Sequence, residues 1–538
     1  MKKLFLLLSL GLSVVAFYSC NDDDNPVDEI PEELVIQKDA DAANYVKGIF
    51  KTQNAGSGYS FLLESASEAT ISFEGEDTED GPLVSQFDID PNNGYVSWIW
   101  SRQYEAVAAA NIAIEKISDI PAGEGEILSE YGKNTALGGA YFVRGLAYFY
   151  LVQLWGEVPL YTSTANATGG DRAPVSAIYA QIEADLKKAE ELFPEKTSFK
   201  SEPNKYAADA VLSRVYLTWA TLTTTPDNTK FANAVTYADK VINSKQYALL
   251  SDIIQNWGRY NKNGQEHIYT ISYVLGEDGP NDGGNHQSHC AFSYGFDADP
   301  NTQPPHIGPS SITLYDRWND ADQRKEFSYT AHLLKPHTDQ VYTFLPPRTL
   351  PVFGKGIDRS FEDGPLVGPS ERDMDRIELR YAEVLLIKAE ALIESNQKLA
   401  EARSLINEIR HRAYRLGAYA DPQHPAAVTE DEVDIPATAN QAELRDALRE
   451  ERFNEFVYEQ KRWLDLVRWH NLAETVKTVA TFPEYTETYA PGSFFAKVQK
   501  HLKAKYAAIT ANPTKYYRFP IPETAIETNS TLTQNPGY

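Results

Sequence analysis

The sequence predicts a mainly α-helical protein, in which tetratricopeptide-like helix pairs form a scaffold and a loop-rich, irregular half carries short strands. Three observations favour this fold class. Apolar residues recur at helical spacing in pairs of neighbouring segments, although without the fixed period of about 34 residues of a regular array. Residues from about 245 to 375 are instead rich in Gly, Pro, Asn, His and aromatic residues, with short strand-like pieces such as HIYTISYVL. A hydrophobic content of 42% over 538 residues is ample for a large buried core.

Two consecutive segments predict helices in that core. The segment TALGGAYFVRGLAYFYLVQLWGEVPLY is too densely apolar for one face, which indicates a helix buried on most sides and stopped by Gly156 and Pro159. In DRAPVSAIYAQIEADLKKAEELFP, Pro174 stands where a first helical turn accepts it, and Pro194 lies beyond the helix end. The inner face of this second helix is expected to hold Ile178, Ile182, Leu186 and Ala189.

Two helix pairs are the clearest organisation. KYAADAVLSRVYLTWA and FANAVTYADKVINS form the first pair, and RYAEVLLIKAEALIE and LAEARSLINEIRHRA form the second. The second helix of the first pair is expected to face its partner with Phe231, Val235, Ala238 and Ile242. We expect one domain over residues 39–538, with the helical scaffold at about 39–245 and 376–470 and a loop-rich insertion at about 245–375.

The N-terminus has the form of a secretory signal. Lys2 and Lys3 form a short basic start, and residues 4–17 are almost all apolar. A small residue, Ser19, stands before Cys20 and suggests a lipoprotein processing site. Residues 1–19 are then the signal peptide and Cys20 is the lipidated first residue of the mature chain; the alternative is cleavage nearby, with Cys20 left as an ordinary thiol. Residues 20–38 are acidic and proline-punctuated, so we expect a flexible tether.

Charge and cysteine content exclude several classes of protein. The formal net charge is -26, and it becomes -28 when Lys2 and Lys3 leave with the signal. Such a chain repels nucleic acid and anionic membrane surfaces. If Cys20 carries lipid, Cys290 has no partner within the chain, so no disulfide framework is expected. After the signal no stretch is long and apolar enough for a membrane-spanning helix, and attachment would be by lipid alone.

Two kinds of stretch imitate metal sites. GGNHQSHC brings His286, His289 and Cys290 together, but a fourth ligand at a matching spacing is missing, which argues against zinc. DIDPNNG, and DADPN at 297–301, begin like calcium loops without keeping the calcium-loop spacing, so we interpret both as turns. We therefore expect no metal site and no cofactor; a structural calcium ion elsewhere among the loop carboxylates is the alternative.

Five blocks, in order, carry a resemblance to a known family. They are YFVRGLAYFYLVQLWGEVPL, KYAADAVLSRVYL, RYAEVLLIKAEALIE, LRDALREERFNEFVYEQKRWLDLVRW and the ending YRFPIPETAIETNSTLTQNPGY. The chain resembles the SusD/RagB-like outer-membrane lipoproteins of Bacteroidetes, and the resemblance covers nearly its whole length. The acidic run after Cys20 is similar to the signal that sends such lipoproteins to the outer face of the outer membrane.

This resemblance implies fold, place and partner together. It implies a helical half carrying a loop-rich half, docked as a lid on a partner TonB-dependent transporter of the SusC type, with no catalysis. The protein would be lipid-anchored in the outer membrane and face the cell exterior. It also favours a structural interpretation of conspicuous charges. We expect an internal ion-pair network for Arg144 and for the block that holds Glu450, Glu451, Arg452, Glu455, Arg462, Asp465 and Arg468.

The ligand is predicted to be an oligosaccharide or polysaccharide. A pyranose presents an apolar face and a rim of hydroxyls, so its binder needs flat aromatic platforms with polar groups at their edges. In the family the contacts come from an early loop and a mid-chain loop, which here offer Phe73, Glu76 and Asp77, and Tyr273, His289, Phe292, Tyr294 and Phe296. The alternative for each aromatic is packing within its own loop, and of Trp98 and Trp100 we expect at least one in the core.

The net charge makes a neutral glycan the more favoured ligand, although a local arginine such as Arg259 could reverse that preference. Three other functions stay open at this point. The same kind of transporter could receive peptides instead of glycans. Two suitably placed carboxylates could make a glycoside hydrolase. A repeat scaffold could also have another protein as its only ligand.

Overall fold

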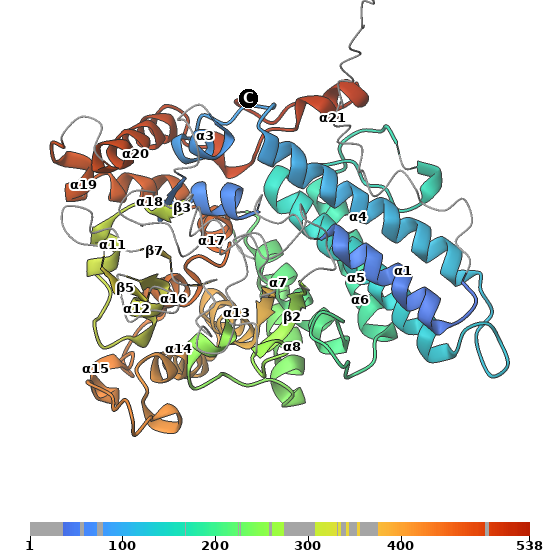
Figure 1. The fold of residues 1–538 in the computed structure, drawn as a ribbon, viewed down its shortest axis with the longest axis horizontal. Coiled ribbons are helices and arrows are strands. Elements are labelled where there is room, and N and C mark those ends of the chain that lie inside the picture. The colour runs from blue at the N-terminus through green and yellow to red at the C-terminus, as the bar shows by residue number, and fades with distance from the viewer. Residues whose placement is uncertain are drawn as a thin grey trace, which may run out of the picture.

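The computed structural model describes residues 36–53, 59–72, 79–166, 168–223, 225, 227–257, 261–273, 307–330, 332–334, 341–343, 352–353, 355, 375–489 and 494–538. Helices dominate these residues, and the strands form only two-stranded antiparallel sheets, which confirms the mainly α fold (Figure 1). One cluster of buried apolar residues runs from Ile36 to Leu532 and so joins elements from both ends of the chain. Within the described ranges, no helix is both long and apolar enough to cross a membrane.

Long helices from the first half of the chain lie side by side at one end of the molecule (Figure 1). Successive helices pack on each other, so the layer grows in chain order from α4 to α8. The helices are α1 (Asp39–Thr52), α4 (Gly94–Ser118), α5 (Glu130–Trp155), α6 (Val175–Leu192), α7 (Lys205–Ala220) and α8 (Asn228–Ser244).

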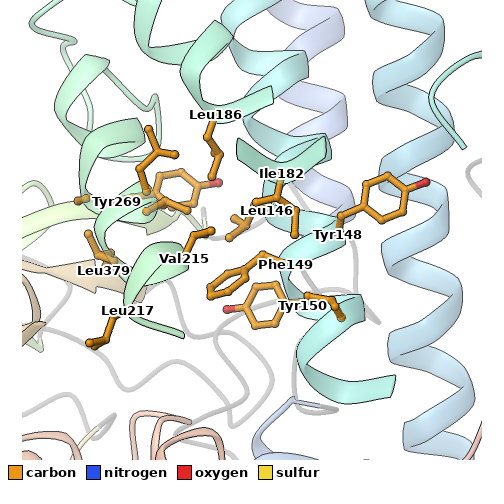
Figure 2. Packing of buried hydrophobic residues seen from close by; sticks show 14 of the residues in the cluster. Leu146, Tyr148, Phe149, Tyr150, Ile182, Leu186, Val215, Leu217, Tyr269 and Leu379 are labelled. Carbon is orange, nitrogen blue, oxygen red and sulfur yellow. The ribbon is translucent and has the colours of Figure 1, made fainter. Parts of the chain in front are cut away.

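Helix α5 is the centre of this layer, as its uniform apolar character predicts. From Ala136 to Trp155 almost every side chain is buried, and the helix ends at Gly156, whose φ of 76° favours glycine. Helix α6 begins directly after Pro174 and buries the four predicted residues of its inner face. Figure 2 shows how Leu146 and Phe149 of α5 meet Ile182 of α6, with Val215 of α7 beside them. Both helix predictions are confirmed.

The two predicted helix pairs are α7 with α8 and α13 (Tyr381–Glu394) with α14 (Leu399–Ala413). Helix α13 also packs against α8, so the pairs join although the loop-rich stretch separates them in sequence. One detail of the prediction was wrong. Helix α8 buries Phe231, Ala234, Ala238 and Val241, whereas Val235 and Ile242 are half-buried at the edge of the core. Because α8 contacts both α7 and α13, its buried stripe is rotated toward the second neighbour.

Helices continue beyond the predicted scaffold limit at residue 470. This part of the chain holds α18 (Leu472–Val479), α19 (Pro483–Thr486), α20 (Phe494–Ala511) and α21 (Glu523–Thr528). Between α14 and α18 the chain forms α15 (Glu430–Val433), α16 (Gln441–Phe456) and α17 (Arg462–Arg468). In Figure 1 helices α18 to α20 lie at the opposite end of the molecule from α1 and α6.

The strands and short helices belong mainly to the loop-rich part. The paired strands are β1 (Thr70–Ser72) with β3 (Ile307–Pro309), β2 (His267–Ile271) with β8 (Arg376–Arg380), β4 (Tyr329–Thr330) with β7 (Val352–Phe353), and β5 (His332–Leu334) with β6 (Val341–Thr343). Strand β2 confirms the strand expected in HIYTISYVL. The short helices are a π-helix, η1 (Ser60–Glu64), and α3 (Asp80–Gln86), α11 (Ile312–Asp316) and α12 (Gln323–Ser328).

Arg144 has the structural role expected of it. Its side chain is only 4% exposed, in the middle of the buried helix α5. Its Nε and Nη2 donate to the Asp185 carboxylate of α6 at 2.9 and 2.6 Å, and Nη1 donates to Asn111 Oδ1 of α4 at 2.7 Å. One guanidinium therefore links three helices of the layer.

Arg144→Met is expected to lower the free energy of unfolding by about 3–5 kcal/mol, because it leaves the Asp185 carboxylate buried without its cation. Denaturant unfolding followed by tryptophan fluorescence measures this change. The control is Lys188→Met, which breaks the exposed Lys188–Glu191 pair on α6 and should cost less than about 1 kcal/mol. Similar losses in the two variants would contradict the structural role of Arg144.

Candidate functional site

Most of the predicted glycan-binding residues lie outside the described residues. This is so for Phe73, Glu76, Asp77, His289, Phe292, Tyr294 and Phe296, and equally for Cys20, Arg259, His286, Cys290 and the 297–301 stretch. Their assignments stay predictions. Tyr273 and the segments that flank the loops are described.

Tyr273 is not the exposed platform that we expected. Its side chain is 1% exposed and belongs to the main apolar core. Its backbone N–H donates to Asp375 Oδ1 at 3.3 Å, and its carbonyl accepts from Lys262 Nζ at 2.5 Å. Tyr273 follows the fully buried strand β2, and Asp375 precedes the partner strand β8, so the sheet holds this residue inside. Trp100 is also in the core, where its ring meets Trp155 edge-on at 5.1 Å between centroids, as expected for one of the two tryptophans.

The bases of the two predicted binding loops lie side by side. Strand β1 ends at Ser72, directly before Phe73 of the early loop, and β3 begins at Ile307, within the loop-rich stretch and after its predicted binding residues. Antiparallel pairing sets Ser72 opposite Ile307 and Thr70 opposite Pro309. Two segments more than two hundred positions apart therefore enter the same place on the scaffold.

Buried polar groups hold the base of the early loop in position. Lys505 of α20 is 1% exposed, and its Nζ donates to the carbonyls of Ser65 and Ser67 at 2.8 and 2.5 Å. Burial lowers the pKa of Lys505 to about 7. On the other side, Glu64 Oε1 accepts the backbone N–H of Gln460, and burial raises the pKa of Glu64 to about 8. This segment includes the π-helix η1, a form common near functional sites.

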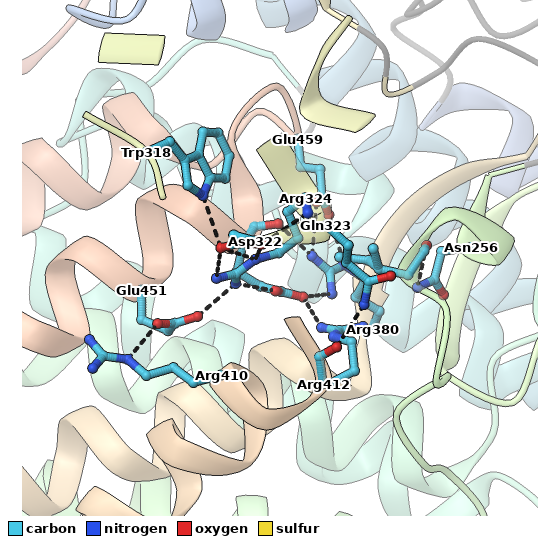
Figure 3. A network of polar contacts seen from close by, with 12 residues as sticks. Asn256, Trp318, Asp322, Gln323, Arg324, Arg380, Arg410, Arg412, Glu451 and Glu459 are labelled. Atoms are coloured by element: carbon cyan, nitrogen blue, oxygen red, sulfur yellow. Dashed lines mark hydrogen bonds and ion pairs between the residues drawn. The ribbon is translucent and has the colours of Figure 1, made fainter. Parts of the chain in front are cut away.

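A buried ionic network holds the loop-rich part on the scaffold (Figure 3). Its centre is Glu455 of α16, which is 0% exposed. The Glu455 carboxylate accepts from Arg324 Nη1 at 2.9 Å, from Arg380 Nη1 at 2.5 Å and from Arg412 Nη2. Burial alone would raise the pKa of Glu455, but Arg412, Arg380 and Arg324 outweigh it and hold the pKa well below its ordinary range.

Three cations of this network come from the loop-rich stretch or its edge. Arg324 belongs to α12 and Arg380 to β8, and the buried Lys355 donates to Glu455 O and Glu459 Oε1 at 2.6 and 2.8 Å. The internal ion-pair interpretation of the charged block is thus confirmed, with one exception: Glu450 is exposed on α16. The other pairs are Glu451 with Arg324 and Arg410, Arg452 with Asp465, Arg462 with Glu68, and Arg468 with Glu390 and Asp465.

A cavity of about 630 Å³ lies beside the loop bases. Glu68, two residues before β1, and Trp318, which follows α11, line it together with Phe453, Arg462 and Trp469 from α16 to the end of α17. Arg462 stacks over Phe453 at 4.9 Å, and Arg449 over Trp469 at 5.0 Å. The lining holds five arginines and six acidic residues, so its charge is close to balanced.

Two buried polar atoms of the cavity lining have no hydrogen-bond partner among the described residues. They are an acceptor, Glu68 Oε2, and a donor, Arg449 Nε. Buried polar atoms are usually paired, by protein or by something bound. These two atoms are themselves inaccessible, so the groups that the cavity offers to a ligand are its aromatic rings and its other charged and polar side chains.

Sequence reasoning missed this cavity because it looked for binding aromatics only in the two loops. Phe453 and Trp469 each follow directly after a buried arginine, Arg452 and Arg468. Both rings border the ionic network, because Phe453 lies beneath Arg462 and Trp469 Nε1 donates to Glu390 Oε1 at 2.7 Å. Aromatic residues interleaved with arginines in the charged block were therefore a usable signal.

The described residues contain no group of three or more His, Cys, Asp or Glu that could hold a metal ion. The stretch DIDPNNG forms a turn that leads into α4, where Asn93 Oδ1 caps the helix by accepting from Val96 N–H. Asp90 Oδ1 accepts from Asn92 N–H within that turn. Its polar atoms thus have the local role that we predicted.

Taken together, these features define a helical-repeat scaffold with a polar, aromatic-lined cavity beside the strands that flank the two predicted loops, as a binding protein has. Residues 301–538 match the family model described as SusD family, and residues 30–217 match one described as starch-binding and associating with the outer membrane. SusD-like protein P2 of Formosa agariphila is 29% identical over 86% of this chain and 89% of its own. The chain belongs to the SusD/RagB family and is a SusD-like nutrient-binding protein.

Solved structures share the fold. A SusD homolog from Bacteroides thetaiotaomicron superposes with a TM-score of 0.75 at 21% identity, over 94% of this chain and 98% of its own. A structure described as a laminarin-binding SusD-like protein gives a TM-score of 0.67 at 22% identity, over 93% of this chain and 99% of its own. The family is known for binding proteins, which agrees with the expectation of a non-enzymatic role.

The buried Glu64 predicts a pH-dependent stability. Its pKa in the folded protein is raised to about 8 from an ordinary 4.5, so between these values the unfolded state binds fewer protons and stability falls as the pH rises. Glu64→Gln keeps an acceptor for Gln460 N–H and removes this dependence. We expect the variant to gain on the wild type by up to about 1.4 kcal/mol per pH unit between pH 5 and 8.

Free energies of unfolding at constant salt measure this difference. Glu191→Gln, at an exposed glutamate of α6, controls for the loss of one carboxylate. If the Glu64→Gln difference were the same at pH 5 and pH 8, Glu64 would not be the buried, protonated group described above.

Proposed function

We propose that the protein is a surface-exposed lipoprotein that captures oligosaccharide or polysaccharide and delivers it to a partner TonB-dependent outer-membrane transporter of the SusC type. The observation that carries the proposal is the cavity beside the paired strands β1 and β3, next to which the two loops that we predict to bind glycan leave the scaffold.

The chemistry of the cavity favours a neutral, hydroxyl-rich ligand. A sugar hydroxyl both donates and accepts, and so it can bond to the arginine and to the carboxylate side chains of the lining. Aromatic rings such as those of Phe453 and Trp469 suit the apolar face of a pyranose. A polyanionic glycan would find no net positive charge in the lining, where six acidic side chains offset five arginines, and it would approach a chain of net charge -26.

The comparisons support the same class of ligand. One matching family model is described as starch-binding, and one solved structure of the same fold as laminarin-binding. Starch and laminarin are both neutral glucans. The description "associating with outer membrane" supports the location, and we propose lipid attachment through Cys20 from the form of the N-terminus.

Calorimetric titration of the lipid-free chain, residues 21–538, tests ligand class and activity together. The panel contains neutral and acidic polysaccharides and a mixed peptide digest. Heat with neutral glycans, and no new reducing ends afterwards, is the expected result. Heat from peptides alone would favour peptide capture, and new reducing ends would identify a glycoside hydrolase.

Phe73→Ala and Tyr294→Ala should each weaken glycan binding by about tenfold or more if these rings are the stacking platforms, since stacking is worth about 1–2 kcal/mol. Tyr131→Ala is the matched control, because it removes a ring that is 63% exposed near the start of α5, in a segment outside both predicted loops. Equal affinities in all three variants would remove both residues from the site.

Cys20→Ala is expected to abolish lipid attachment, because the thiol is the acylation point. Detergent partitioning of whole-cell extracts measures the result: the wild type should enter the detergent phase and the variant should stay soluble or remain as precursor. Cys290→Ala is the control for loss of a thiol. Unchanged partitioning of Cys20→Ala would contradict the anchor.

A further inference from the structure

A second cavity, of about 400 Å³, lies against the long-helix layer. Three parts of the chain line it: helix α4, the segment that follows α5 from Pro159 to Gly169, and helix α21 with the tail to Leu532. It shares no lining residue with the cavity beside the loop bases. In Figure 1 the two regions lie apart, because α4 and α21 are near one end and α11 and α18 near the other.

The lining of this cavity contains no charged residue. Asp, Glu, Lys and Arg make up 23% of the chain, and none is among the fifteen residues that line the cavity. A charged ligand would lose its hydration here without meeting an opposite charge. The composition therefore selects a neutral occupant.

The walls combine aromatic rings with hydroxyl groups. Tyr104 lies between Trp100 and Tyr161, with ring centroids 5.0 and 5.6 Å away, and Tyr104 and Tyr161 are half-buried. Three residues that carry hydroxyl groups, Ser101, Thr168 and Thr524, line the same space. Such a wall presents flat apolar faces with donors and acceptors at their edges, which is what a neutral pyranose requires.

Hydrogen bonds between the three parts keep the cavity open in one shape. Tyr104 OH donates to Pro159 O at 2.9 Å, and Asn111 Nδ2 donates to Tyr161 O at 3.2 Å, so α4 holds the segment after α5. Asn529 Nδ2 donates to Gly170 O at 2.9 Å and ties the other wall to the same segment. A preformed cavity binds a small ligand without a large ordering cost.

We infer that this cavity is an accessory binding site for a single neutral pyranose unit of a longer glycan, separate from the site at the loop bases. The inference rests on the proposed function, since it takes the same class of ligand. A tyrosine oxygen that donates to a backbone carbonyl can still accept, so Tyr104 and Tyr161 offer acceptors to the sugar as well as ring faces.

The test fills the cavity without removing any of the bonds that shape it. Ala108→Trp acts from the α4 side and Thr528→Trp from the α21 side, and both positions are exposed at the cavity. Ala232→Trp, at an exposed position of α8 outside the cavity lining, is the matched control. The probes are malto- and laminari-oligosaccharides at millimolar concentration, titrated by calorimetry into the lipid-free chain of residues 21–538.

The wild type and Ala232→Trp should show a strong and a weak binding event, and both cavity-filling variants should weaken the weak event about tenfold or more while leaving the strong one unchanged. Two tryptophan variants on different elements guard against misfolding of either one. Identical isotherms in all four proteins would overturn the accessory site but leave the proposed function standing. No heat from any glycan would overturn both.

Discussion

The buried carboxylate of Glu455 is the constraint on which the arrangement of the two halves depends. It accepts from Arg324, Arg380 and Arg412, and all four side chains are 0–1% exposed. Burying this many charges is costly unless each has its partners. An alternative packing that moved the loop-rich part would leave several guanidiniums unpaired at once. The main effect of the network is therefore to fix one position of the loop-rich part on the scaffold. Its contribution to the net free energy of folding is secondary.

That constraint explains how long loops can be placed reliably. The helix pairs provide a rigid layer, and the ionic network fixes α12 and β8 upon it. The β1–β3 pairing, with Lys505 beneath it, then sets the point from which the loops depart. Surface loops on a rigid frame generally vary in length and sequence without disturbing the core.

The sequence predicted those features whose signals are local. The dense apolar run of α5, the proline limits of α6 and the helix pairs could be read from spacing alone. The burial of Tyr273 could not be predicted in this way, because residue type does not tell whether the end of a strand faces a core built by distant helices. Glu455 was placed in an ionic network, but its partners Arg324 and Arg380 lie far away in sequence and became visible only in the fold. The cavity beside the loops was missed for the same reason.

A main site and a weaker accessory site, set apart on one scaffold, suit a protein that must capture a polymer and then release it. A glycan repeats the same unit, so a chain held at one site presents further units to the other at high effective concentration. The gain in affinity then comes from the spacing of the two sites and not from tight contacts at either one. It disappears when the glycan leaves either site. The walls of the two cavities also favour release, because one is uncharged and the other is close to charge-balanced. Such walls would hold a sugar by stacking and hydroxyl contacts, without a strong ionic attraction. A capture protein built this way can transfer its ligand without first unfolding a binding site.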